Sequence, residues 1–163
     1  MIEFFAWLEA TSLSIWLRES MIGFPLSLVM HALGMAFLVG VHFLLDLRIL
    51  GIAGNVPLAP LQRFFPLMWF SFFLALFSGL LLLLAYPAKG LTNPVFYSKL
   101  LLVAAALLVG TVLARRTVNE PAVISSNTRL MALLSLCLWA TVITLGRLLA
   151  YTYKVLSSFE LTF

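Results

Sequence analysis

Two histidines, His31 and His42, are the only imidazoles of the chain, and both stand in the segment HALGMAFLVGVHFLLDLR. An α-helix turns by about 100° per residue, so these side chains differ by only about 20° around the axis, and Met35 lies about 40° from His31. The rise of about 1.5 Å per residue separates the histidines by roughly 16 Å. Imidazole nitrogen and thioether sulfur are ligands of haem iron and Cu(I). The segment therefore presents two candidate ligand positions on one helical face.

A cation near the C-terminus has a suitable position to meet the first histidine. Thr144, Arg147 and Tyr151 are spaced three and four residues apart and form one helical stripe. If the last apolar segment runs antiparallel to the first, Arg147 and His31 lie at similar depths. A charge at mid-membrane costs about 2.5–3.5 kcal/mol and normally has a partner. We therefore expect Arg147 and His31 to face each other in the interior.

These residues suit a b-type haem, in which histidine ligates the iron and arginine binds a propionate. One layer would use His31 with Arg147, and a second layer would use His42 with Met68 or Met131. The residues assigned to haem binding are His31, His42, Met68, Arg147 and Tyr151.

Two other interpretations stay open. His31, Met35 and His42 offer nitrogen and sulfur ligands for copper, with Cys137 as a further donor. Alternatively no cofactor is bound: the histidines form hydrogen bonds between helices, and Arg147 anchors a carbonyl group, a lipid phosphate or a partner.

The composition indicates what kind of element positions these residues. Of 163 residues, 63% are hydrophobic and 10% are charged, and the mean hydropathy is +1.12. Such a chain is typical of an integral membrane protein. Its ten Lys and Arg residues give a net charge of +4 but form no tract. They indicate membrane topology and not a nucleic-acid partner.

We predict an all-α fold, an integral membrane four-helix bundle that forms one domain over residues 1–163. Four spans are expected at about 22–47, 63–86, 95–115 and 128–153, preceded by an amphipathic interfacial helix at 2–19 that contains two tryptophans. Ser20 with Pro25, and Asn93, are the expected start signals of the first and third spans. The arginines of the first and third connections favour a topology with both termini outside the cytoplasm.

Small residues at four-residue spacing predict where the spans pack, because helices in lipid associate through close backbone approach. The three predicted stripes are Ala32, Ala36 and Gly40; Ser71, Ala75 and Gly79; and Ala106, Gly110 and Ala114. We expect the first three spans to pack together and the fourth to close the bundle.

Four stretches carry a resemblance to a known family: HALGMAFLVG with DLRILG, FPLMWFSFFLALFSGLLL, NPVFYSKLLL, and GRLLAY. Over nearly the whole chain they resemble an uncharacterised family of small four-helix bacterial inner-membrane proteins, which has no settled activity. The resemblance implies that the family pattern is occupied by His31, Asp46, Arg48, Lys99, Gly146 and Arg147. His42 is outside that pattern, which favours His31 with Arg147 as the main site. The predicted helix that contains both histidines is also faintly similar to copper-resistance membrane proteins and b-type cytochromes.

The expected function is an accessory or haem-holding subunit of a membrane electron-transfer assembly. The sequence contains no nucleophile–base pair, phosphate loop or metalloprotease motif, so we expect no independent catalytic activity. The expected partners are the lipid bilayer and either other membrane subunits or a second copy of the chain. The alternatives are a non-catalytic structural subunit of a larger complex and a copper-handling membrane protein.

Overall fold

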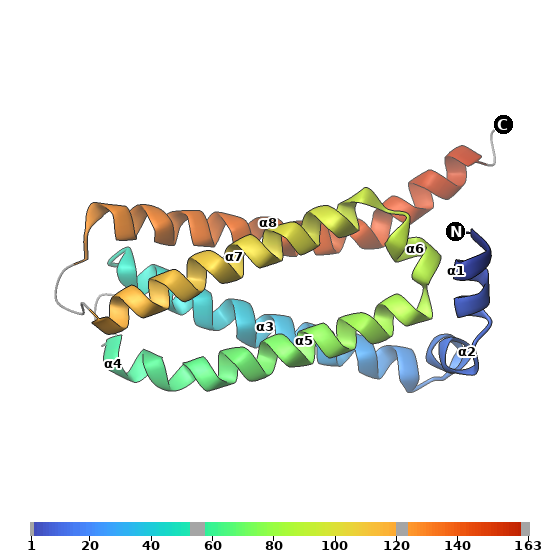
Figure 1. Cartoon of the computed structure of the whole chain (residues 1–163), viewed down its shortest axis with the longest axis horizontal. Helices are drawn as coiled ribbons and strands as arrows, with labels where there is room; N and C mark the ends of the chain where they lie inside the picture. The colour runs from blue at the N-terminus through green and yellow to red at the C-terminus, as the bar shows by residue number, and fades with distance from the viewer. Residues whose placement is uncertain (1, 53–57, 120–123, 161–163) are drawn as a thin grey trace.

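Four helices are long and apolar enough to cross a membrane in the computed structural model, which describes residues 2–52, 58–119 and 124–160 (Figure 1). They are α3 (Gly23–Ile49), α5 (Phe65–Ala85), α7 (Pro94–Asn119) and α8 (Ser126–Glu160). The shorter elements are α1 (Ile2–Glu9), α2 (Ser12–Glu19), α4 (Leu58–Leu61), the 3-10 helix η1 (Gln62–Phe64) and α6 (Pro87–Leu91). The described residues contain no strand, which confirms the all-α prediction.

Local hydrogen bonds explain where the first and third long helices begin. The Ser20 hydroxyl oxygen accepts hydrogen bonds from the backbone N–H groups of Ile22 and Gly23, at 3.1 and 3.0 Å. The Asn93 side-chain oxygen accepts one from the N–H of Val95 at 2.9 Å. The first N–H groups of a helix have no intrahelical partner, so these side chains satisfy groups that would otherwise be unpaired. Asn93 thus acts as predicted, and Ser20 binds the N–H groups where α3 begins, although the N-cap residue of α3 is Ile22.

The N-terminal segment forms two helices, so the prediction of one helix at 2–19 is wrong. The Thr11 hydroxyl caps α2 by accepting from the N–H of Ser14 at 3.3 Å, and it donates to the Leu8 carbonyl at 2.7 Å. A threonine at such a position competes with helix continuation through these local bonds. The Ser14 hydroxyl also donates to the Leu84 carbonyl at 2.8 Å, which fixes α2 to the end of α5.

The long helices place apolar side chains outside and small polar side chains inside. Exposed residues include Leu33 and Phe37 on α3 and Phe73 and Phe77 on α5. The buried polar residues of the long helices are Ser27, His42, Asp46, Ser71, Ser78, Thr117, Thr128 and Ser135. Water would strongly disfavour such a broad apolar exterior. The arrangement therefore fits a multi-pass membrane protein surrounded by lipid.

The long helices pack in two pairs, and the predicted packing order is wrong. The most extensive contacts join α3 to α5 and α7 to α8, and the two pairs meet where α3 contacts α8. The third span thus packs mainly on the fourth. Figure 1 shows α6 linking α5 to α7 at the end that also holds α1 and the C-terminal part of α8.

Two of the three small-residue stripes face other helices, but the stripe on α3 does not. Ala32, Ala36 and Gly40 are exposed, and no heavy atom lies within 4 Å of a side-chain carbon built on Gly40. The close approach to α5 occurs instead at Gly34, where such a carbon would lie 2.7 Å from the backbone nitrogen of Ala75. Gly34 lies on the side of α3 that carries the histidines, so the histidine face makes the contact.

Replacing Gly34 with alanine should therefore weaken the packing of α3 on α5. The added carbon meets backbone atoms of Ala75, which move only if a helix shifts. We expect a loss of about 1–3 kcal/mol in the free energy of unfolding, typical of overpacking, measured by denaturation of the detergent-solubilised protein. Gly40→Ala is the matched control on the same helix, and it should be neutral or stabilise by up to about 1 kcal/mol through helix propensity. Equal stabilities of the two variants would contradict this contact.

Candidate functional site

Both histidines lie on the inward face of α3, as the helical spacing predicts. His31 is half-buried, and His42 is 2% exposed. Gly34 and Leu38 lie between them on the same face and are buried. The same side of α3 therefore carries two imidazoles at different depths, each facing a different set of helices.

The His31 ring is held by α5. Its Nδ1 lies 2.9 Å from the carbonyl oxygen of Ala75, and because a carbonyl only accepts, Nδ1 is the donor. The Ser78 hydroxyl lies 3.4 Å from the same nitrogen. Gly79 makes space for the ring, since a side-chain carbon there would lie 3.2 Å from it. This bond fixes the ring orientation and leaves Nε2 as the unprotonated nitrogen of the neutral imidazole.

The cation beside His31 is Lys99 of α7, and not Arg147. The Lys99 charge acts electrostatically on His31, and its side chain is half-buried. Its Nζ lies 3.4 Å from the position of a side-chain carbon on Gly146 of α8. Lys99 thus reaches from α7 towards both α3 and α8. The resemblance named Lys99 and Gly146 as pattern positions, but the depth argument alone did not select them.

Arg147 points away from the histidines, so its predicted inward pairing with His31 is wrong. Its side chain is exposed and stacks over the Tyr151 ring, 5.9 Å from the ring centroid. Thr144 and Tyr151 are exposed as well. Gly146 occupies the inward position, and the next residue on a helix is turned by about 100° from it. The depth of Arg147 in the membrane does not determine the direction of its side chain. The rotation of α8 about its axis decides that Gly146, and not Arg147, faces inward.

His42 contacts three helices in a confined space. Its Nδ1 donates to the Leu38 carbonyl at 2.8 Å, within α3. Its ring centroid lies 4.9 Å from that of Trp139 on α8. Its opposite edge meets α7 at Gly110, where a side-chain carbon would lie only 2.4 Å from Nε2. The space beyond Nε2 is therefore occupied by the backbone of α7.

Asp46 lies one turn further along α3 and is 0% exposed. The Ser135 hydroxyl of α8 is its polar neighbour, but neither side chain has a partner in hydrogen-bonding geometry. Because α3 and α8 run antiparallel, His42 and Asp46 face Trp139 and Ser135, which are also one turn apart. We call these four residues the buried polar cluster. Five of its side-chain atoms are buried without a hydrogen-bond partner: His42 Nε2, Asp46 Oδ1 and Oδ2, Ser135 Oγ and Trp139 Nε1.

The hydrogen bond of His31 is the kind that a haem-ligating histidine makes, whereas the surroundings of His42 leave no room for an iron at its free nitrogen. A haem ligand usually donates its second ring nitrogen to a carbonyl or carboxylate, as His31 does to Ala75. At His42 an iron bound to Nε2 would stand where α7 leaves no room for a methyl carbon. The two methionines that were predicted as alternative partners of His42 lie in different parts of the core. Met68 belongs to the buried apolar cluster that contains Leu38 and Trp139, whereas Met131 packs against a second buried apolar cluster.

The candidate copper ligands are not gathered in one place. Met35 packs against the apolar core cluster around Leu38, and Cys137 is exposed on α8. Over the described ranges, no group of three or more His, Cys, Asp and Glu side chains could hold a metal ion. The chemistry of the interior therefore concentrates in the His31–Lys99 pair and the buried polar cluster.

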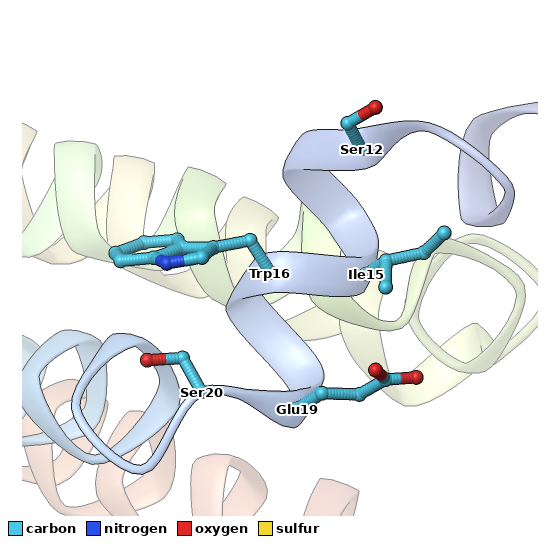
Figure 2. A pocket seen from close by; sticks show the side chains of 5 residues that line it. All are labelled: Ser12, Ile15, Trp16, Glu19 and Ser20. Carbon is cyan, nitrogen blue, oxygen red and sulfur yellow. The ribbon is translucent and has the colours of Figure 1, made fainter.

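An open pocket on α2 contains none of the predicted site residues. It is lined by Ser12, Ile15, Trp16, Glu19 and Ser20. Figure 2 shows that these side chains do not converge, because Trp16 extends to one side of α2 while Ile15 and Glu19 extend to the other. The pocket is a surface feature of the N-terminal helices.

No protein-family model, curated protein or solved structure matches this chain. The resemblance to small bacterial inner-membrane proteins therefore stays a prediction, and function is argued from the chemistry of the two sites.

Cysteine labelling should test the rotation of α8 that turns Arg147 outward. Val142 is 0% exposed and its neighbour Ile143 is 50% exposed, so one samples the inward side and the other the outward side of α8 at nearly one depth. In a Cys137→Ser background, we expect Ile143→Cys to react with N-ethylmaleimide in detergent several-fold faster than Val142→Cys. Mass spectrometry measures the modified fraction. A faster reaction of Val142→Cys than of Ile143→Cys would mean that Arg147 faces inward.

Proposed function

We propose that this protein is a four-helix bundle of the bacterial inner membrane that holds a b-type haem at His31, as an accessory subunit of an electron-transfer assembly. Its chemistry would be one-electron transfer by the haem iron. The chain itself would supply an axial nitrogen, a positive charge and an apolar enclosure. We propose no haem at His42, because α7 fills the space at its free nitrogen.

The observation that carries the proposal is the hydrogen bond from His31 Nδ1 to the Ala75 carbonyl, at 2.9 Å. Such a bond selects one tautomer, orients the ring and increases the basicity of the other nitrogen. The His31 side chain is half-buried, whereas His42 is 2% exposed. Lys99 replaces Arg147 as the cation that would bind a propionate. The proposal therefore keeps the predicted ligand and changes its partner.

Charge and aromatic residues support the proposed membrane placement. Five arginines occupy one end of the long helices or the connections there: Arg48, Arg63, Arg115, Arg116 and Arg129. By the positive-inside rule these arginines support a cytoplasmic location of that end, with both termini in the periplasm. Trp7 and Trp16 on α1 and α2 are 63% and 53% exposed, which suits helices at the membrane interface.

The outward face of α8 supports a contact with another membrane subunit or a second copy of this chain. Its exposed polar and reactive side chains are Cys137, Thr141, Thr144, Arg147 and Tyr151. A guanidinium that faces acyl chains is costly unless it reaches the interface or a partner. The chain offers no second histidine near His31, so a partner would also be the source of any second imidazole ligand.

The optical spectrum of the protein purified after haem-supplemented expression tests the proposal. We expect a Soret band in the wild type that is lost in His31→Ala, because the axial nitrogen is removed. Lys99→Ala should reduce haem occupancy several-fold, and Lys99→Arg should restore it if the positive charge is what binds the propionate. Arg147→Ala is the matched control and should keep the band, because this side chain faces outward.

A featureless wild-type spectrum, or a Soret band that survives in His31→Ala, would reject the haem. If the protein without haem still co-purified with other membrane subunits, and Arg147→Ala abolished this, the chain would instead be a non-catalytic assembly subunit. Stoichiometric copper in metal analysis would support the copper-handling alternative.

A further inference from the structure

The buried polar cluster has a hydrogen-bond imbalance that the haem proposal does not use. His42 Nδ1 donates to Leu38, so Nε2 carries no proton and only accepts. An ionised Asp46 adds two oxygens that only accept. The donors of the cluster are the N–H of Trp139, whose ring packs on His42, and the hydroxyl of Ser135 beside Asp46, and none of these atoms has a hydrogen-bond partner. The cluster therefore has more acceptors than hydrogens to share among them.

This imbalance defines the chemical class of the ligand. An anion is excluded, because it would add acceptors to a site that lacks donors. A calcium ion takes six to eight oxygen ligands, and the side chains of the cluster offer two carboxylate oxygens and one hydroxyl. A proton requires one acceptor, and it turns an acceptor atom into a donor. A proton, delivered by water, is the ligand that corrects the deficit.

The position of Asp46 gives it access to one aqueous phase while its side chain stays enclosed. It lies three residues before the end of α3, so only about 5 Å of helix separates it from that end. Buried hydroxyls of Thr128 and Ser135 follow the same face of α8 from this end towards Asp46. The Ser125 hydroxyl, 3.0 Å from that of Thr128, continues the line to the exposed start of α8.

No other acid competes with Asp46 in the described part of the interior. The neighbouring buried residues of α4, α7 and α8 are Leu61, Leu113 and Ala132, with Ser135. Helix α5 contains no titratable residue. The titratable and charged residues of α3 near this level are His42 and Arg48, and Arg48 is turned by about 200° from Asp46 around the helix. Arg63, Arg115, Arg116 and Arg129 are exposed.

We propose that the buried polar cluster is an intramembrane proton-binding site, in which Asp46 takes up and releases a proton while Ser135, Trp139 and His42 supply its hydrogen-bonding environment. On uptake, a hydronium ion from the aqueous phase at the end of α3 gives its proton to a carboxylate oxygen. One O–H bond breaks, another forms at Asp46, and a water molecule is left. Release is the reverse step. The inference is independent of haem binding at His31.

Infrared difference spectroscopy of the full chain in lipid, between buffers of about pH 6 and about pH 9, tests this site, because exposed Asp and Glu side chains stay ionised in both. We expect the wild type to show a carboxylic-acid C=O stretching band that appears on acidification and shifts to lower frequency in D2O. Asp46→Asn should lose this band completely. Asp46→Glu should keep a band that responds to pH at a different frequency, and Glu19→Gln, at the exposed end of α2, should leave the wild-type band unchanged.

Each contrary result would overturn the proposal. A wild-type band that ignores the buffer pH would mean that Asp46 is permanently protonated and only structural. Absence of any such band in the wild type would mean that Asp46 remains ionised, and the same band in Asp46→Asn would place the proton elsewhere. Circular dichroism checks that the variants fold. If Asp46→Asn does not fold, the wild-type response together with the frequency shift in Asp46→Glu decides the assignment.

Discussion

The close approach of α3 to α5 at Gly34 is the contact on which the rest of the interior depends. A glycine allows the α3 backbone to come near Ala75, and the same approach lets His31 reach the Ala75 carbonyl. Once this face of α3 is turned inward, the helical repeat also turns His42 and Asp46 inward. Lipid offers no hydrogen bonds, so these polar groups depend on the facing helices and enclosed water. A single interhelical contact thus determines which residues of α3 are available for chemistry.

The histidine spacing predicted this face correctly, because residues eleven positions apart share a side of an α-helix. The hydropathy likewise predicted four long apolar helices, since nothing else in this composition can cross 30 Å of hydrocarbon. The inward cation was missed for a physical reason. Lys99 and Arg147 lie near the same end of the protein, and depth alone does not distinguish them. Only the rotation of α7 and α8, which tertiary packing sets, turns Lys99 inward and Arg147 outward.

The small-residue stripes also show that a sequence pattern alone does not determine which face of a helix packs against its neighbour. Helix α3 has two faces with small residues: Ala32, Ala36 and Gly40 on one, and Gly34 on the other. The longer stripe matches the usual packing motif, yet α5 contacts the face that also bears His31. The hydrogen bond and the close backbone contact together favour that face. A motif that counts only residue size cannot include the contribution of a neighbouring polar side chain.

The two polar levels of α3 have different chemistry because their glycines are placed differently. Gly79 leaves room beside His31, whereas Gly110 brings the α7 backbone against the free edge of His42. The backbone of α7 therefore closes the free edge of His42, whereas the bond to Ala75 leaves the second ring nitrogen of His31 unprotonated. His31 and Asp46 are fifteen residues apart, roughly 22 Å along the helix. At an effective dielectric constant of about 20, one unit charge at each level would interact by about 0.8 kcal/mol. Electron and proton chemistry at the two levels would then influence each other only weakly, so a substitution at one level reports mainly on that level.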